Sequence, residues 1–338
     1  MKLAVLGAAE SGVGAAILAQ QKGYDVFVSD RGSIREHYKS LLDAHALPWE
    51  EGQHTAEQIL DADEVVKSPG IPDDAPMVKA LREKGVPILS ELEFAARYTQ
   101  AQLLCITGSN GKTIVKEWIY QLLSPSETVT RSPRSYNSQI GVPLSVWLLN
   151  EHSRVALFEA GISRPGEMSA LRHIIRPTLG VLTNIGAARE ANFATPDEKC
   201  MEKLKLFKHT AALIYCVDDP LVDRCLDASH YAGRRIGWSR RSPQAAFYAE
   251  VIPTSGHTAT VGSTPDTTHN ATHIRLHDRD GQRIVAFDIP FDDEASIENA
   301  IHTAIVGLQL QLTPTQIGER MPHLDPVAMR LEVKQGVR

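Results

Sequence analysis

Short apolar runs alternate with amphipathic stretches along the N-terminal part of the chain. The strand-like runs lie at residues 2–6, 25–29, 64–67 and 87–89. The amphipathic stretches between them lie at residues 13–22, 33–45 and 77–84. Buried strands joined by helices are typical of βαβ units, whose strands run parallel. The pattern therefore predicts an α/β fold that begins with a Rossmann-like, doubly wound domain over residues 1–99.

The alternation of strand and helix starts again near residue 100. Strands are expected at residues 103–106, 155–159, 179–182 and 213–217. Helices are expected at residues 115–123, 167–175, 197–207, 220–228 and 295–310. Between 246 and 290, strands alternate with turn signals such as Asp280-Gly281, which favours antiparallel strands added to the sheet. We therefore expect a P-loop NTPase-like central domain over residues 100–338.

Length and composition agree with two globular domains. A chain of 338 residues exceeds what one hydrophobic core usually supports, and 43% hydrophobic with 22% charged residues argues against a disordered or fibrous protein. The net charge of −6 and the scattered Lys and Arg residues provide no broad basic face, so nucleic acid is not an expected partner. The short run of Arg234, Arg235, Arg240 and Arg241 is interpreted as a solvated loop.

Cysteine usage and hydropathy favour a cytoplasmic location. Cys105, Cys200, Cys216 and Cys225 show no CxxC spacing and are expected to be reduced core residues. The chain opens with a strand and a turn instead of a signal-peptide core, and no apolar run approaches the length of a membrane span. We expect a monomer with no membrane partner.

The first glycine-rich turn, residues 7–14, stands between a strand and a helix. Glycines there let backbone N–H groups approach a phosphate, and the helix N-terminus favours its negative charge. The turn lacks the middle glycine of GxGxxG, and Asp30, 23 residues after Gly7, is placed to accept hydrogen bonds from a ribose. By itself the turn fits a dinucleotide enzyme, a UDP-sugar binder, or glycines that serve only tight packing of helix on strand.

The second glycine-rich turn is more specific, because it follows a buried strand and opens a helix. It consists of Gly108, Ser109, Asn110, Gly111, Lys112 and Thr113. Lys112 is expected to neutralise the β- and γ-phosphates of ATP, and Thr113 to offer its hydroxyl to Mg²⁺. The N–H groups of residues 109–112 are expected to form an anion cradle. Ile106 replaces the first glycine of GxxxxGK[ST], so the full pattern is not met.

Two further positions are candidates for the same chemistry. Glu159 ends the strand at 155–159, and ligands of open α/β sheets bind beyond the carboxyl ends of strands. Glu159 is therefore a candidate Mg²⁺ ligand, with an acid that caps a strand end near solvent as the alternative. Lys203 and Lys205 lie on an amphipathic helix, where periodicity alone predicts solvated lysines.

Several separated motifs occur in order along the chain. They are TGSNGKT at 107–113, the strand ending in Glu159, TNIG at 183–186, the lysine-bearing helix, ENA at 298–300 and a late strand with Arg330. In this combination the chain resembles the Mur ligase family, whose members are ATP-dependent, amide-forming enzymes of bacterial cell-wall synthesis. The resemblance covers nearly all of the chain.

The resemblance involves two branches of that family. Residues 1–113, with GAAESG, VSDR, KSPGIP and SELEFA, resemble the ligases that add D-glutamate to UDP-N-acetylmuramoyl-L-alanine. Residues 107–338, with SYNSQIGVPLSVW, FEAGISRPGEM, TNIGAARE and DPVAMRLEV, resemble the central domain of the ligases that add D-alanyl-D-alanine, in the form fused to alanine racemase. The change of partner at Thr113 indicates a hybrid chain joined at GSNGKT.

The resemblance also implies ligands and roles. It implies ATP and Mg²⁺ as cofactors and a UDP-N-acetylmuramoyl peptide as substrate, with UDP and not NAD at the first turn. The implied substrate residues are Ser11, Gly12, Asp30, Arg31, Ser68, Gly70 and Asn137. The implied metal ligands are Thr113, Glu159 and Lys203, the last as a carbamate. Asn299 is implied to lie near the adenine, and Arg330 to reach the ATP phosphates and act in catalysis with Lys112 and Lys203.

Two departures from the family pattern limit the expected activity. Ala187, Ala188 and Arg189 follow TNIG where the family has a histidine metal ligand, and a guanidinium has no lone pair to offer a cation. The chain stops at Arg338, so we expect the family's C-terminal amino-acid-binding domain to be absent and ligation to be slow or lost. The alternatives are an inactive scaffold made by exchanging domains and an NAD-dependent oxidoreductase that uses the first turn.

Overall fold

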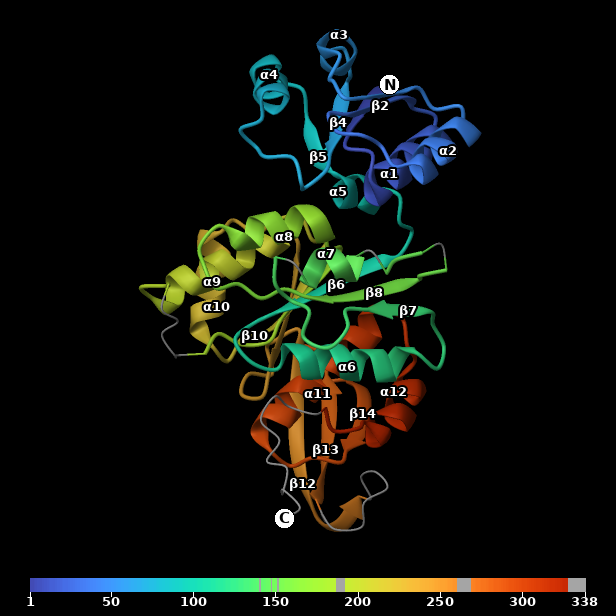
Figure 1. Ribbon diagram of the computed structural model, residues 1–338. Helices are drawn as coiled ribbons and strands as arrows, with labels where there is room; N and C mark the ends of the chain where they lie inside the picture. The colour runs from blue at the N-terminus through green and yellow to red at the C-terminus, as the bar shows by residue number, and fades with distance from the viewer. Residues whose placement is uncertain (140, 147, 151, 187–191, 260–268, 328–338) are drawn as a thin grey trace, which may run out of the picture. The chain divides into compact units, whose positions relative to one another are not determined.

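Two compact units make up the chain, Met1–Thr99 and Gln100–Arg338. The computed structural model describes residues 1–139, 141–146, 148–150, 152–186, 192–259 and 269–327. Each unit is built around its own sheet, with helices packed on the sheet's two faces (Figure 1). The prediction of an α/β fold with two successive sheets is confirmed.

The first unit contains a five-stranded parallel sheet in the order β3-β2-β1-β4-β5. Its strands are β1 (Lys2–Leu6), β2 (Asp25–Asp30), β3 (Trp49–Glu51), β4 (Glu64–Lys67) and β5 (Ile88–Ser90). Its helices are α1 (Glu10–Gln21), α2 (Glu36–Ala44), α3 (Ala56–Leu60), α4 (Pro76–Lys84) and α5 (Glu91–Ala96). The hydrophobic pattern did not indicate β3, α3 or α5, because such short elements span too few residues to show a period.

The first strand shows why this unit has helices on both faces of its sheet. Successive side chains of a strand point to opposite faces. Leu3 and Val5 enter one apolar cluster with α1 and α2, whereas Ala4 and Leu6 enter a second cluster with α3 and α4. Both faces are therefore buried, as is typical of parallel sheets whose strands are joined by helices. The carboxyl ends of the strands then lie along one edge of the sheet.

The second unit contains a nine-stranded sheet in the order β14-β13-β12-β11-β10-β9-β6-β8-β7. Its strands are β6 (Gln102–Thr107), β7 (Val129–Arg131), β8 (Val155–Glu159), β9 (Leu179–Leu182), β10 (Ala212–Cys216), β11 (Arg234–Ser239), β12 (Phe247–Ala259), β13 (His269–His277) and β14 (Arg283–Ile289). The strands from β7 to β12 pair in parallel, and β12, β13 and β14 pair antiparallel, which confirms the predicted antiparallel addition.

Helices cover both faces of this second sheet (Figure 1). They are α6 (Lys112–Leu123), α7 (Gly141–Val146), α8 (Glu167–Ile175), α9 (Pro196–Leu204), α10 (Pro220–Ala228), α11 (Glu294–Gln309) and α12 (Pro314–Arg320). α6 packs against α11 on one face, where Trp118 and Ile301 join Leu104 and Ile106 of β6 in the apolar core. Among the described residues, none of the helices combines the length and the apolar composition that crossing a bilayer requires.

The position of β6 determines where a ligand can bind in this unit. β6 lies between β8 and β9, so the chain continues to one side of β6 and later returns to the other side. In open α/β sheets this reversal leaves a crevice at the carboxyl ends of the two neighbouring strands. The turn after β6 opens at that edge, which prepares the site described below.

The arginine run differs from its prediction as a solvated loop. β11 begins at Arg234 and is a sheet strand with a buried half, Ile236–Ser239. Arg235 pairs with Asp227, and Arg240, which follows the strand, pairs with Glu294 at the start of α11. The guanidinium groups of Arg235 and Arg240 therefore form ion pairs with carboxylates of neighbouring helices. The short apolar strand was missed because charged residues flank it in the sequence.

A buried histidine links α11 to the carboxyl edge of the same sheet. Trp238 Nε1 donates to His302 Nδ1 at 3.2 Å, and His302 Nε2 donates to Thr183 O at 3.3 Å. This arrangement uses the neutral imidazole, because Nδ1 must accept. Burial lowers the pKa of His302 from 6.5 to about 4.

Acid should therefore destabilise the chain through His302. The unfolded state takes up a proton below about pH 6.5 while the folded state resists until about pH 4, so stability is lost as pH falls through that window. Between about pH 7 and pH 5 this group should remove about 2 kcal/mol of unfolding free energy. Urea unfolding at both pH values should show a correspondingly smaller pH effect in His302→Gln. An equal pH effect in both proteins would contradict the assignment.

Candidate functional site

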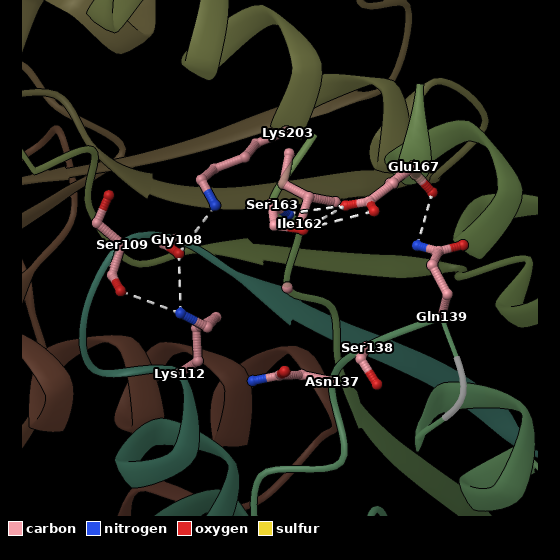
Figure 2. Close-up of a pocket in the computed structure, with 11 residues that line it drawn as sticks. Gly108, Ser109, Lys112, Asn137, Ser138, Gln139, Ile162, Ser163, Glu167 and Lys203 are labelled. Atoms are coloured by element: carbon pink, nitrogen blue, oxygen red, sulfur yellow. Dashed lines mark hydrogen bonds between the residues drawn. The ribbon is translucent and has the colours of Figure 1, made fainter. Parts of the chain in front are cut away.

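A glycine-rich turn joins β6 to α6 and forms the centre of the candidate site (Figure 2). Gly108 has φ +151° and Gly111 has φ +78°, which side-chain-bearing residues rarely adopt. A Cβ atom on Gly108 would lie 1.9 Å from Thr183 Oγ1, and one on Gly111 would lie 2.4 Å from Asn299 Oδ1. Both positions therefore require glycine, and Asn299 of α11 lies directly against the turn.

Residues 183–186, which follow β9, stabilise the β6–α6 turn through hydrogen bonds. Ser109 N–H donates to Asn184 O at 2.8 Å, and Asn110 N–H donates to Asn184 Oδ1 at 3.1 Å. Two of the amides expected in the anion cradle thus have protein partners. The amides at the N-terminus of α6 remain the candidates for phosphate contact, because the first N–H groups of a helix point away from its own carbonyls.

Two lysine side chains converge on one carbonyl of the turn (Figure 2). Lys112 Nζ donates to Gly108 O and to Ser109 O, both at 3.0 Å, and Lys203 Nζ donates to Gly108 O at 3.1 Å. Lys203 is 2% exposed, so the prediction that it is solvated is wrong, whereas Lys205 is half-exposed and pairs with Glu202. Lys203 lies on the side of α9 that faces the end of β6, where the carbonyl of Gly108 accepts a hydrogen bond from its buried amine.

The carboxylate of Glu159 lies beside this turn at the end of β8. Thr113 Oγ1 donates to Glu159 Oε2 at 3.1 Å, and Asn137 Nδ2 donates to the same oxygen at 3.4 Å. Lys116 Nζ lies 2.9 Å from Oε1. The side chain of Glu159 is 0% exposed, so it is not an acid that caps a strand end near solvent.

The hydroxyl of Thr113 at the start of α6 and the carboxylate of Glu159 at the end of β8 fit a single hard divalent cation. Mg²⁺ prefers oxygen ligands and keeps phosphate oxygens and waters in its shell. Thr113 and Glu159 would provide the protein ligands. Within the part of the chain that the structure describes, no group of three or more His, Cys, Asp and Glu side chains could hold a metal. Thr113 and Glu159 leave most positions around a cation to other oxygen ligands, such as phosphate oxygens and waters.

A cavity of about 430 Å³ opens next to the turn. Its lining residues are Gly108, Ser109, Lys112, Asn137, Ser138, Gln139, Gly161, Ile162, Ser163, Glu167 and Lys203. The cavity brings the implied substrate residue Asn137 together with Lys112 and Lys203 (Figure 2). The sequence interpretation missed Ser138, Gln139 and the segment after β8, although their place beyond a strand's carboxyl end was a usable signal.

Glu167 shapes the wall of the cavity that follows β8. Its Oε2 accepts the N–H groups of Ser163 at 2.7 Å and Arg164 at 3.0 Å. These backbone hydrogen bonds lower the pKa of Glu167. The glutamate at the start of α8 therefore fixes the backbone of residues 163–164 beside the lysines.

Apart from Asn137, the residues implied to bind a UDP-sugar lie at the carboxyl edge of the first unit's sheet. Asp30 Oδ2 accepts Ala8 N–H at 2.7 Å, and Asp30 Oδ1 accepts Gly32 N–H at 2.8 Å. The carboxylate therefore orders the first glycine-rich turn and has both oxygens engaged by backbone. A Cβ atom on Gly12 would lie 1.9 Å from Gly7 O, so tight packing of α1 on β1 by itself requires glycine there.

Glu91, at the start of α5, joins two of the other implied substrate residues. Ser11 Oγ donates to Glu91 Oε1 at 3.1 Å, and Ser68 also hydrogen-bonds to this carboxylate. Burial raises the pKa of Glu91. Sequence reasoning missed Glu91 because an acid in the first turn of a helix is typical of simple capping. Arg31 and Gly70 are exposed at the same edge of the sheet.

Two parts of the sequence interpretation lie outside the described residues. They are Arg330, implied to reach the ATP phosphates, and Ala187-Ala188-Arg189, which replaces the expected histidine ligand. Their roles stay predictions.

Two family models match the chain. The sequence model described as Mur ligase middle domain matches residues 106–306, more than half of the chain, and the one described as MurD N-terminal domain matches residues 3–77. The chain belongs to the Mur ligase family. The glycine-rich turn after β6, Glu159 and Lys203 all lie within the part that matches the Mur ligase middle domain.

Individual Mur ligases show how far the similarity extends. The UDP-N-acetylmuramoylalanine–D-glutamate ligase of Bacteroides fragilis is 42% identical over 239 residues, which cover 67% of this chain and 50% of that protein. The ligase of the same name from Christiangramia forsetii is 30% identical over 350 residues, covering 98% and 69%. The chain spans about half the length of several curated relatives that it matches.

A solved Mur ligase shares the fold at much lower sequence identity. A crystal structure of MurF from Acinetobacter baumannii matches with a TM-score of 0.60 at 18% identity, covering 92% of this chain and 62% of that one. This likeness confirms the fold.

Replacing Gly108 should distort the β6–α6 turn. Gly108→Ala places a Cβ against Thr183 Oγ1 and Asn184, so we expect a loss of about 2–4 kcal/mol in unfolding free energy and of nucleotide binding. Gly166→Ala is the matched control, because Gly166 also has a positive φ, +91°, but its Cβ would meet nothing within 4 Å. That variant should lose about 1 kcal/mol and keep its ligands. Equal losses in both variants would show that contact at the turn is unimportant.

Proposed function

We propose that the chain carries the nucleotide-binding and acceptor-binding parts of an ATP-dependent ligase of peptidoglycan precursor synthesis. The observation that carries this proposal is the meeting of Lys112, Thr113 and Glu159 at a glycine turn beside a cavity that also contains Asn137. A carboxylate bound near Asn137 would face the γ-phosphate of ATP bound at the turn. That placement fits carboxylate activation by phosphoryl transfer, followed by amide formation.

In this proposal, the carboxylate of a UDP-N-acetylmuramoyl peptide attacks the γ-phosphorus of ATP, and ADP leaves as the acyl phosphate forms. The incoming amine then attacks the acyl carbon and releases inorganic phosphate. Lys112 would move from Gly108 O and Ser109 O to the transferring phosphoryl group and stabilise its charge. Asn299, against Gly111, would lie on the adenine side of the turn, and Arg330 would contact the phosphates.

Thr113 and Glu159 would hold Mg²⁺, which supplies charge neutralisation at the phosphates when bound. We propose that Lys203 is carbamylated, since its buried amine lies next to the same turn and a carbamate would add an oxygen ligand there. Arg189 replaces the family's histidine, so we also propose that the second metal is held weakly and that this chain binds its ligands but ligates slowly.

We propose that the first unit binds the UDP part of the substrate, through Ser11, Gly12, Arg31, Ser68 and Gly70. The match to the MurD N-terminal domain over residues 3–77 supports this assignment. The NAD alternative relies on the same glycine-rich turn, and in the structure each oxygen of Asp30 accepts one backbone N–H group of the loops at the carboxyl edge. Asp30 is therefore proposed to act by ordering the turn that contacts UDP.

We also propose that two branches of the family join within GSNGKT. The supporting observation is that motifs before Thr113 resemble the D-glutamate ligases, whereas motifs after it resemble the D-alanyl-D-alanine-adding ligases.

Calorimetric titration tests the proposed ligands directly. The chain should bind ATP with Mg²⁺ and UDP-N-acetylmuramoyl-L-alanine in saturable fashion, and should not bind NADH. Saturable NADH binding without ATP binding would replace the proposal with an oxidoreductase. If none of the three ligands binds, an inactive scaffold is the better description.

Removing the amine of Lys112 should weaken nucleotide binding selectively. A charge-assisted contact to phosphate of about 2 kcal/mol corresponds to about 30-fold in the ATP dissociation constant of Lys112→Ala. Lys208→Ala, at an exposed lysine after α9, is the matched control and should bind ATP like the unaltered chain. Unchanged ATP affinity in Lys112→Ala would remove the proposed role of this lysine.

A further inference from the structure

Lys116, one turn of α6 after Lys112, is completely buried. Lysine is almost never fully buried unless its charge is paired. Lys116 Nζ lies 2.9 Å from Glu159 Oε1 and 3.0 Å from Glu117 Oε1. It also donates to Ser132 O at 2.8 Å and to Arg134 O. The amine is therefore surrounded by oxygen atoms from α6, β8 and the segment that leads to Asn137.

The two oxygens of Glu159 face different partners. Oε1 faces Lys116 in the protein interior, whereas Oε2 faces Thr113 Oγ1 and Asn137 Nδ2. Thr113 is the proposed metal ligand of the phosphate turn, and Asn137 lines the cavity. One side of the carboxylate is thus held by a lysine, and the other side is directed toward the site.

We propose that Lys116 is a positioning residue that holds Oε1 of Glu159 and leaves Oε2 as the single oxygen offered to Mg²⁺. This inference rests on the proposed function, because it assumes that Glu159 is a metal ligand. Lys116 touches neither nucleotide nor substrate in this arrangement. It acts through Glu159 and, by way of Ser132 and Arg134, on the segment that carries Asn137.

The consequence is selectivity among divalent cations. Mg²⁺ is small and demands a near-octahedral shell, which suits one oxygen from each carboxylate, whereas Ca²⁺ accepts six to eight ligands and readily takes a carboxylate through both oxygens. While Lys116 holds Oε1, two-oxygen binding is blocked. Without the amine, Glu159 can turn both oxygens toward the cation, and Ca²⁺ gains more than Mg²⁺.

The test is nucleotide binding supported by each cation in turn. The dissociation constant of a fluorescent ATP analogue is measured with Mg²⁺ alone and with Ca²⁺ alone, for the unaltered chain, Lys116→Met and Lys116→Gln. We expect the affinity with Ca²⁺ relative to Mg²⁺ to rise about tenfold in the neutral variants. A lysine that served only to hold the segment 132–134 would weaken binding with both cations equally, and an unchanged ratio would overturn the proposal.

Two further variants separate the possible outcomes. Glu117→Gln removes the other carboxylate near Lys116 but leaves the Glu159 contact, so its cation ratio should equal that of the unaltered chain. Lys116→Arg keeps a cation beside Oε1 and should also keep the ratio; it provides the test if the neutral variants do not fold, and a raised ratio there overturns the proposal. If the unaltered chain binds no nucleotide with either cation, the proposed function itself fails.

Discussion

Close packing around the backbone of the β6–α6 turn is the constraint on which the site depends. Gly108 lies against Thr183 and Gly111 lies against Asn299, so neither turn position has room for a side chain. Thr183 belongs to the segment after β9, and Asn299 belongs to α11, more than a hundred residues away. The β6–α6 turn is therefore held in place by elements that meet only in the folded second unit. The conformation of the turn depends on contacts with distant segments of the second unit.

Charge is distributed unevenly around that turn. The amines of Lys112 and Lys203 meet at Gly108 O on the cavity side, while the carboxylate of Glu159 is buried with Lys116 behind it. Positive charge therefore faces the cavity, and a paired negative charge lies buried beside it. Because buried charges are costly unless paired, Lys116 and Glu159 stabilise each other in the absence of ligands.

Elements with a clear period were predicted well from the sequence, and short elements were not. The strands at 155–159 and 179–182 and the helices at 167–175 and 220–228 have the same bounds in the structure. β7 and α7 were missed, because three to six residues cannot establish a period. β11 was missed for another reason. Arginines flank its apolar half, and their ion pairs with Asp227 and Glu294 depend on neighbouring helices.

The sequence by itself determined the α/β class, the glycine-rich turn between a strand and a helix, and the family, because these follow from local periodicity and from motifs of consecutive residues. Only the tertiary structure decided what individual polar side chains do. Lys203 lies on the polar side of an amphipathic helix, yet it is buried at Gly108. Asp30 supports a turn with both oxygens. Periodicity predicts which residues share a face of a helix or strand. It does not predict which distant segment of the chain packs against that face.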